Sequence, residues 1–177
     1  GQSMVVGDQS GELRLFEASK RVERAKVRAH ESAIHSVAMA PDNLACASAG
    51  TDGYVKIWDA QNGEEWLQLK AYDEPAVAVA FSPSGNLLAS AGLNSDVRLW
   101  NSITGQSRGS IPAGAIALAF SPDGQTLATS DSSGAVRLWD PFTAASRSHL
   151  EGPATPAAND VLDAKVEPAP DPLLDSG

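Results

Sequence analysis

The sequence predicts an all-β fold made of repeated four-stranded sheets, and a recurring five-residue strand carries this prediction. The aromatic residues that end its four copies are spaced 42, 42 and 39 residues apart. Each copy alternates apolar and basic residues before that aromatic residue: Leu13–Glu17, Val55–Asp59, Val97–Asn101 and Val136–Asp140. A period of about 40 residues ending in such a strand is typical of the blades of a β-propeller. We therefore predict a partial β-propeller of about three and a half four-stranded blades.

Each predicted blade repeats one succession of strands and turns. The innermost strand is small and apolar on both faces, as a strand packed between neighbours should be. A Pro-containing turn leads to a second strand, and a Gly- or Asn-containing turn leads to the recurring strand. The innermost strands are expected at 34–39, 76–81 and 115–120, the second strands at 44–49, 86–91 and 125–130, and the polar outer strands at 20–28, 64–70, 106–111 and 145–150.

The chain divides into a propeller segment over residues 1–150 and a tail over residues 151–177. The blade boundaries are expected at 1–28 for a partial blade, then at 29–70, 71–111 and 112–150. The tail holds five prolines, six acids and one Lys, so it contributes −5 of the net charge of −9. This acidic, Pro-rich composition predicts a disordered tail or linker.

The second blade shows the fullest motif. Ala29-His30 begins this blade, with Ala29 at the position of a Gly in the signature given next, and Trp58-Asp59 closes its recurring strand. This pattern resembles the Gly-His and Trp-Asp signature of the WD-repeat family of β-propellers, and the resemblance covers essentially residues 3–150. It implies a buried hydrogen-bond network formed by His30, Ser48, Asp52 and Trp58. Such a network would give each buried polar group a partner, so this blade should be the most firmly held.

The other copies depart from this motif. In the third blade Tyr72 takes the place of the His and Asn94 that of the Asp, while Ser90 and Trp100 remain. The fourth copy has no His, and the first has Phe16 for Trp. The remaining positions are occupied by Ser10 in the first copy and by Thr129, Ser133 and Trp139 in the fourth. We expect only the second blade to hold a complete network.

The number of blades is too small for a closed ring. A closed propeller needs at least four blades, and members of the family usually have about seven. The chain also starts inside a predicted strand, so we expect a fragment of a longer propeller. The alternative is a half-propeller that closes by self-association, because open blade edges invite pairing.

Composition limits the compartments and partners to consider. No run of about 18 apolar residues is present, and the first residues lack the pattern of a signal peptide. One cysteine cannot form an internal disulfide. We therefore expect a cytoplasmic protein, or else a nuclear one, that is neither secreted nor membrane-spanning. The acidic charge makes nucleic acid an improbable partner.

Several residues suggest chemistry that their context argues against. His30 and His35 are five residues apart, one too many for the His-Glu-x-x-His zinc site. Cys46 sits in an apolar strand, where a buried structural role is expected. The basic stretch Lys20–Arg28 suits a solvated outer strand, with a phosphate or acidic peptide contact as the alternative. Trp66 lies outside the repeat and should pack on an outer strand. We predict no metal, no cofactor and no enzymatic activity.

The family resemblance implies a non-catalytic scaffold that docks a peptide or protein on the narrow face of the propeller. Loops leading into the innermost strands would supply the contacts, and most of their residues are small and apolar. The expected partner-binding residues are Ala33, His35, Pro75, Val77, Gly114 and Ile116. They favour a groove for a hydrophobic side chain. The alternatives are a regulatory or substrate-recruiting domain of a larger multidomain enzyme, and the self-associating half-propeller.

Overall fold

The computed structural model describes residues 3–150, which form fifteen β-strands and no α-helix. The predicted tail, residues 151–177, lies outside the described residues. Because this part of the chain is all strand and turn, it offers no helix that could span a membrane. The strands are β1 (Ser3–Gly7), β2 (Glu12–Glu17), β3 (Val22–Arg28), β4 (Ile34–Met39), β5 (Ala45–Gly50), β6 (Tyr54–Asp59), β7 (Glu65–Lys70), β8 (Ala76–Phe81), β9 (Leu87–Gly92), β10 (Val97–Asn101), β11 (Ser107–Ile111), β12 (Ala117–Phe120), β13 (Leu127–Ser130), β14 (Val136–Trp139) and β15 (Ser146–Leu150).

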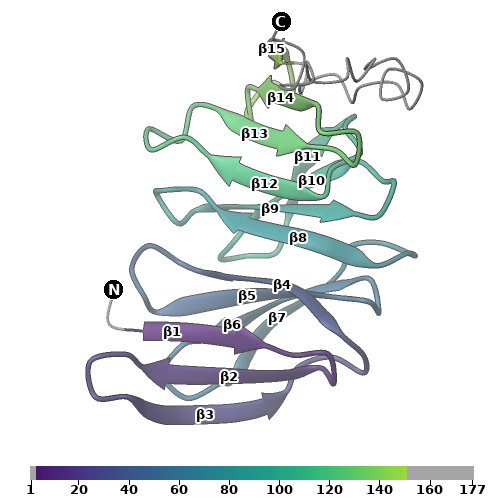
Figure 1. Ribbon diagram of the computed structural model, residues 1–177. Coiled ribbons are helices and arrows are strands. Elements are labelled where there is room, and N and C mark those ends of the chain that lie inside the picture. Colours follow the sequence, from purple (N-terminus) through teal and green to yellow (C-terminus); the bar gives the residue numbers. More distant parts are fainter. Residues whose placement is uncertain (1–2, 151–177) are drawn as a thin grey trace, which may run out of the picture.

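These strands form four antiparallel sheets that stand one behind the next along the molecule (Figure 1). Blade 1 contains β1–β3, blade 2 β4–β7, blade 3 β8–β11 and blade 4 β12–β15, each in chain order within its sheet. Blade 1 therefore lacks one strand of the four-stranded pattern within the described residues. The predicted all-β, partial propeller architecture is confirmed.

The innermost strand of blade 4 is shorter than the sequence suggested. We expected it over 115–120, but β12 begins at Ala117. Five residues cross from the outer strand of one blade to the innermost strand of the next in all three cases: 29–33, 71–75 and 112–116. Since this crossover keeps its length, the three residues missing from the fourth repeat come from the strands on either side of it: β12 has four residues where β8 has six, and β11 has five where β7 has six.

Turn chemistry explains where the first hairpin of each complete blade reverses. Asn43, Gly85 and Gly124 occupy the same position, and their φ angles are 61°, 75° and 69°. Residues with a large side chain seldom adopt this left-handed conformation, whereas Gly and Asn do so readily. The Pro two residues earlier fixes φ for the start of the same turn.

The core lies between the blades. Each tryptophan of the repeat is buried against the preceding blade: Trp58 packs in a cluster with Leu13 and Leu15 of blade 1. Trp100 belongs to the cluster of blade 2, and Trp139 to the cluster of blade 3. The three side chains are only 4%, 8% and 7% exposed. The Trp face of one blade thus covers the Ala, Val and Leu face of the blade before it.

Candidate functional site

A buried hydrogen-bond network links four side chains of blade 2 and the loop before it. His30 Nδ1 lies 3.0 Å from both carboxylate oxygens of Asp52, and its Nε2 lies 2.7 Å from Ser48 Oγ. The indole of Trp58 donates to the same Ser48 Oγ over 2.9 Å. The donors and acceptors balance if Nδ1–H donates to Asp52 and the Ser48 hydroxyl donates to Nε2.

Burial fixes the charge of this network. The His30 side chain is fully buried, and this burial lowers its pKa below the ordinary value of 6.5, although the Asp52 carboxylate acts in the opposite direction. The imidazole is therefore neutral at pH 7, which the acceptor role of Nε2 requires. No buried side-chain nitrogen or oxygen among residues 3–150 lacks a partner. The network ties the loop before β4 to strands β5 and β6.

Tyr72 extends the same arrangement to blade 3 without a His. Its hydroxyl donates to the Ser90 carbonyl over 2.8 Å and lies 3.0 Å from Ser90 Oγ. The indole of Trp100 donates to that Oγ over 2.9 Å. Arg98 caps the ring, with its guanidinium carbon 5.0 Å from the centroid. From the sequence we expected blade 3 to lack a network because Tyr72 replaces the His. In the structure the Tyr72 hydroxyl contacts Ser90 directly.

Blades 1 and 4 use a surface carboxylate instead. In blade 4 Trp139 donates to Thr129 Oγ1 over 3.0 Å, while Ser133 donates to Asp131. Asp131 also pairs with Arg137 at 2.8 Å. Hydrogen bonds from Ser133 are the largest cause that lowers the pKa of Asp131, to about 2. Asp8 accepts hydrogen bonds from both the backbone and the side chain of Ser10 in the matching turn of blade 1.

The residue at the end of the second strand decides between the two arrangements. Gly50 and Gly92 occupy this position in blades 2 and 3, where Asp8 and Asp131 stand in blades 1 and 4. A Cβ on Gly50 would come within 2.5 Å of His30 Nδ1, and one on Gly92 within 2.5 Å of the Tyr72 ring. An aromatic ring and a side chain at this position therefore exclude each other. The repeated Ala-Gly before the turn marks this position in the sequence, but it does not show which ring the glycine faces.

The residues expected to bind a partner lie at one end of the three innermost strands. His35 and Val77 fall where the registers of β4 and β8 shift, so each is an extra, unpaired bulge residue. Ile116 precedes β12, and its side chain is 50% exposed. Strands β4 and β12 both contact β8. The three residues therefore occupy equivalent places, at or just before the start of the innermost strand of adjacent blades, and we call them the row.

The neighbours of this row complete the surface. The other predicted residues are the partly buried Ala33 and Pro75 and the exposed Gly114. His35 Nε2 lies 2.9 Å from Thr51 Oγ1, and Thr51 also donates to the Ala33 carbonyl. Leu93 donates its backbone N–H to the Pro75 carbonyl and leaves its side chain 41% exposed. Thr51 and Leu93 were missed because the sequence marks them only as turn residues.

The surroundings of His30, His35 and Cys46 do not favour a metal site or a reactive thiol. No cluster of three or more His, Cys, Asp or Glu that suits a metal occurs among residues 3–150. His30 is buried, whereas His35 is exposed. Cys46 is buried, and burial raises the pKa of its thiol to about 12. The thiol therefore stays protonated and poorly nucleophilic.

The basic stretch of the first outer strand is largely paired within blade 1. Lys20 and Arg24 both contact Glu17, at 3.0 and 3.1 Å, and Lys26 contacts Glu12 at 2.7 Å. Arg28 donates to the backbone carbonyl of His30 over 3.0 Å and so braces the loop that carries the network. Three of the five basic side chains of this stretch are therefore paired with carboxylates of blade 1.

Comparison with known families agrees with the geometry. The family model of the WD domain, G-beta repeat, matches residues 21–59, 64–101 and 105–140. Each match joins the outer strand of one blade to the three inner strands of the next, for example β3 to β4–β6. A search of curated proteins found no match to the chain. Because the three matches span most of the described strands and end on the Trp-bearing strand that packs each blade onto its neighbour, the chain belongs to the WD-repeat family.

Proposed function

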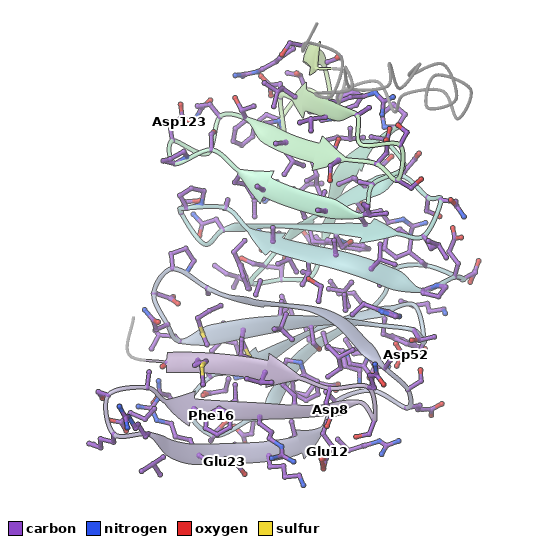
Figure 2. The ribbon with its side chains drawn as sticks, viewed as in Figure 1. Asp8, Glu12, Phe16, Glu23, Asp52 and Asp123 are labelled. Carbon is purple, nitrogen blue, oxygen red and sulfur yellow. The ribbon has the colours of Figure 1, made fainter. Side chains whose placement is uncertain are left out.

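We propose that this chain is a non-catalytic docking module that binds a peptide or protein on its narrow face. The narrow face is the end of the molecule that carries Asp52, at the right in Figure 2. WD repeats generally mediate contacts between proteins. The observation that supports this placement is the position of His35, Val77 and Ile116, which lie at or just before the starts of the innermost strands of adjacent blades.

The chemistry of the row supports an apolar ligand. Leu93 and Ile116 present exposed aliphatic surface, Val77 is partly exposed beside them, and His35 adds one polar contact at the edge. Of the six predicted partner-binding residues, only His35 is ionisable. Catalysis needs convergent acids, bases or nucleophiles, so this surface suits recognition better than a reaction. The partner would place an apolar side chain across the bulges of β4 and β8.

A peptide-display selection against the purified chain tests the proposal. Selected peptides are titrated against the wild type and the double variant His35→Glu/Val77→Glu. We expect the variant to bind at least tenfold more weakly, because two carboxylates would face an apolar side chain. The control, Val22→Glu/Ser110→Glu, adds the same charge at exposed positions on two outer strands and should bind normally. Equal affinities for wild type and the narrow-face variant, with matching melting curves, would refute the placement.

A second candidate function is head-to-tail self-association, and the apolar residues exposed on blades 1 and 4 among residues 3–150 favour it. In each internal interface, a Trp-bearing face covers the small apolar face of the preceding blade. On blade 1 the equivalent face carries Phe16 beside Met4, which is 48% exposed. On blade 4, strand alternation places Val136 and Leu138 on the face opposite Trp139, beside the exposed Ala117 and Ala119. The aromatic face of blade 1 in one copy would therefore pack on the small apolar face of blade 4 in a second copy, as Trp-bearing faces do between blades within the chain.

Light scattering after size-exclusion chromatography tests this second candidate. Self-association predicts a concentration-dependent dimer that Leu138→Glu abolishes. The control, Arg108→Glu, alters an exposed side chain on the outer strand of blade 3 and should leave the dimer intact. A monomer at all concentrations would rule out the half-propeller.

A further inference from the structure

Two neighbouring cavities open at the end of the molecule opposite the narrow face. One, of about 540 Å³, lies between blades 2 and 3, and the other, of about 560 Å³, lies between blades 3 and 4. Both are bordered by Ser84 and Asn86 in the β8–β9 turn, so they meet on either side of that turn. We call them together the turn-side groove. Asp123 lies in its wall, far from Asp52 in Figure 2.

The groove exposes large apolar side chains that the core does not use. Trp66 is 49% exposed, whereas the other three tryptophans are at most 8% exposed. The sequence led us to expect Trp66 to pack on an outer strand, but its position on β7 leaves half of it open. Ile103 is 74% exposed and lines the same cavity, and Phe142, 68% exposed, lines the other. Exposed aromatic and aliphatic residues beside a concavity are typical of a binding surface.

The charges around these residues select a ligand. The cavity beside Trp66 is lined by Asp42 and Glu65 and by no Lys or Arg. Lys56 pairs with Glu65 at 2.9 Å, so Asp42 is the main uncompensated charge. The second cavity contains Asp123, whose pKa is lowered chiefly by a hydrogen bond from Ser121, together with Arg108. The lining holds three acids and one base, and with Lys56 beside Glu65 the net charge is −1, which leaves Asp42 as the acid without a basic neighbour in its cavity.

We propose that the turn-side groove binds an extended partner segment that carries a basic residue and, a few residues along, a bulky apolar residue. The cation would lie on the Trp66 ring beside Asp42, where ring quadrupole and carboxylate both attract it. The apolar side chain would lie against Phe142 and Leu87 in the second cavity. The tail of this chain is a poor occupant, because residues 151–177 hold six acids and one Lys.

Synthetic peptides provide the probe. Acetylated, amidated Ser/Gly peptides would carry one Arg and one Leu separated by one to four residues, with matched peptides in which Glu replaces Arg. Acrylamide quenching reports binding directly, since Trp66 is the one half-exposed tryptophan and a bound segment would shield it. Fluorescence polarisation of labelled peptides gives the dissociation constants. We expect shielding by at least one Arg peptide and none by its Glu counterpart.

Variants locate the binding. Trp66→Ala should weaken it about fivefold and Asp42→Asn about twofold to threefold, with the latter effect lost at high salt. Asp42→Asn keeps the oxygen that accepts the Leu44 N–H, so the turn is preserved. The narrow-face variant His35→Glu/Val77→Glu should bind the peptides normally, which separates this proposal from the proposed function. Absence of shielding by every Arg peptide, equal binding of Glu peptides, or unchanged affinity in both groove variants would overturn it.

Discussion

Blades 2 and 4 hold the equivalent tryptophans, Trp58 and Trp139, by different hydrogen-bond arrangements. In blade 2, Trp58 donates to Ser48, which continues to the buried His30 and to Asp52. In blade 4, Trp139 donates to Thr129, and among the described residues no further side chain continues this hydrogen-bond chain. The turn is held separately by Asp131 near the surface. Packing of the indole is thus common to both, whereas the polar support is either buried and connected or exposed and local.

Blade 3 shows that the buried arrangement tolerates a different aromatic residue. Tyr72 satisfies Ser90 without an acid, and Gly92 leaves room for its ring. The requirement is therefore a ring with a polar atom that reaches the strand serine, together with a glycine beside the ring. A buried connected network should contribute more to stability than a solvated turn, because its loss leaves polar groups unpaired away from water. This difference can be tested from the largest expected effect to the smallest.

Replacement of the glycine beside the ring should have the largest effect. In Gly50→Ala the new Cβ would lie 2.5 Å from His30 Nδ1 and 3.0 Å from an Asp52 oxygen. We expect a loss of about 3 kcal/mol in the free energy of unfolding, as in an overpacked core. Urea denaturation would measure it. The double variant Gly50→Ala/His30→Ala should be close in stability to His30→Ala alone, since the contacts with the imidazole are gone and only the contact of 3.0 Å with the Asp52 oxygen remains.

A matched control is available on the narrow face. Gly114→Ala places a Cβ where nothing lies within 4 Å, so its stability should match the wild type. If Gly50→Ala and Gly114→Ala were equally stable, the mutual exclusion of ring and side chain would be wrong.

Removal of the network itself should cost somewhat less. His30→Ala or Asp52→Ala should each lower the free energy of unfolding by about 2 kcal/mol, because buried polar partners lose their hydrogen bonds. Chemical denaturation at pH 7.5 is the measurement. The two losses should be strongly non-additive in the double variant, since both residues act through one relay. Additive losses would show that the relay is not a unit.

Acid should weaken blade 2 in a defined pH window. Burial lowers the pKa of His30 below 6.5, so the unfolded chain takes up a proton more readily than the folded one. Stability is therefore unaffected above about pH 6.5 and falls as the pH drops below that value, by at most about 1.4 kcal/mol per pH unit for one proton. Denaturation curves between pH 7.5 and pH 5 would reveal the slope. It should be absent in His30→Ala, and an unchanged slope in this variant would exclude His30 as its source.

The sequence predicted the parts of this molecule that follow from periodicity. The spacing of Phe16, Trp58, Trp100 and Trp139 sets the sheets, and Pro and Gly set the turns, because both signals are local. The contacts of Tyr72 and the alternation between Gly50 and Asp131 could not be predicted in the same way. They depend on the distance between a loop and a strand some twenty residues away, which periodicity does not encode. The start of β12 was misplaced for a related reason, since the crossover keeps its length.

The two candidate surfaces differ in the same respect. The narrow-face residues were predicted because they precede the innermost strands in each repeat. The turn-side groove was not predicted, since Trp66, Ile103 and Phe142 come from different blades and meet only after the blades stack. A sequence repeat therefore predicts which residues occupy equivalent positions in the blades. A surface made of residues that differ between the repeats can be recognised only in the folded structure.

The smallest expected effect lies in blade 4. Ser133 is exposed and donates to Asp131, which also accepts its backbone N–H over 2.9 Å. Ser133→Ala removes the side-chain bond but keeps the backbone one, and water can replace the lost donor. We expect a change of no more than about 0.5 kcal/mol in the free energy of unfolding, as for most surface substitutions. Thermal and urea denaturation beside Asp52→Ala would measure it. A loss as large as that of Asp52→Ala would mean that the exposed turn of blade 4 supports its tryptophan as strongly as the buried relay of blade 2, and the distinction between the two blades would fail.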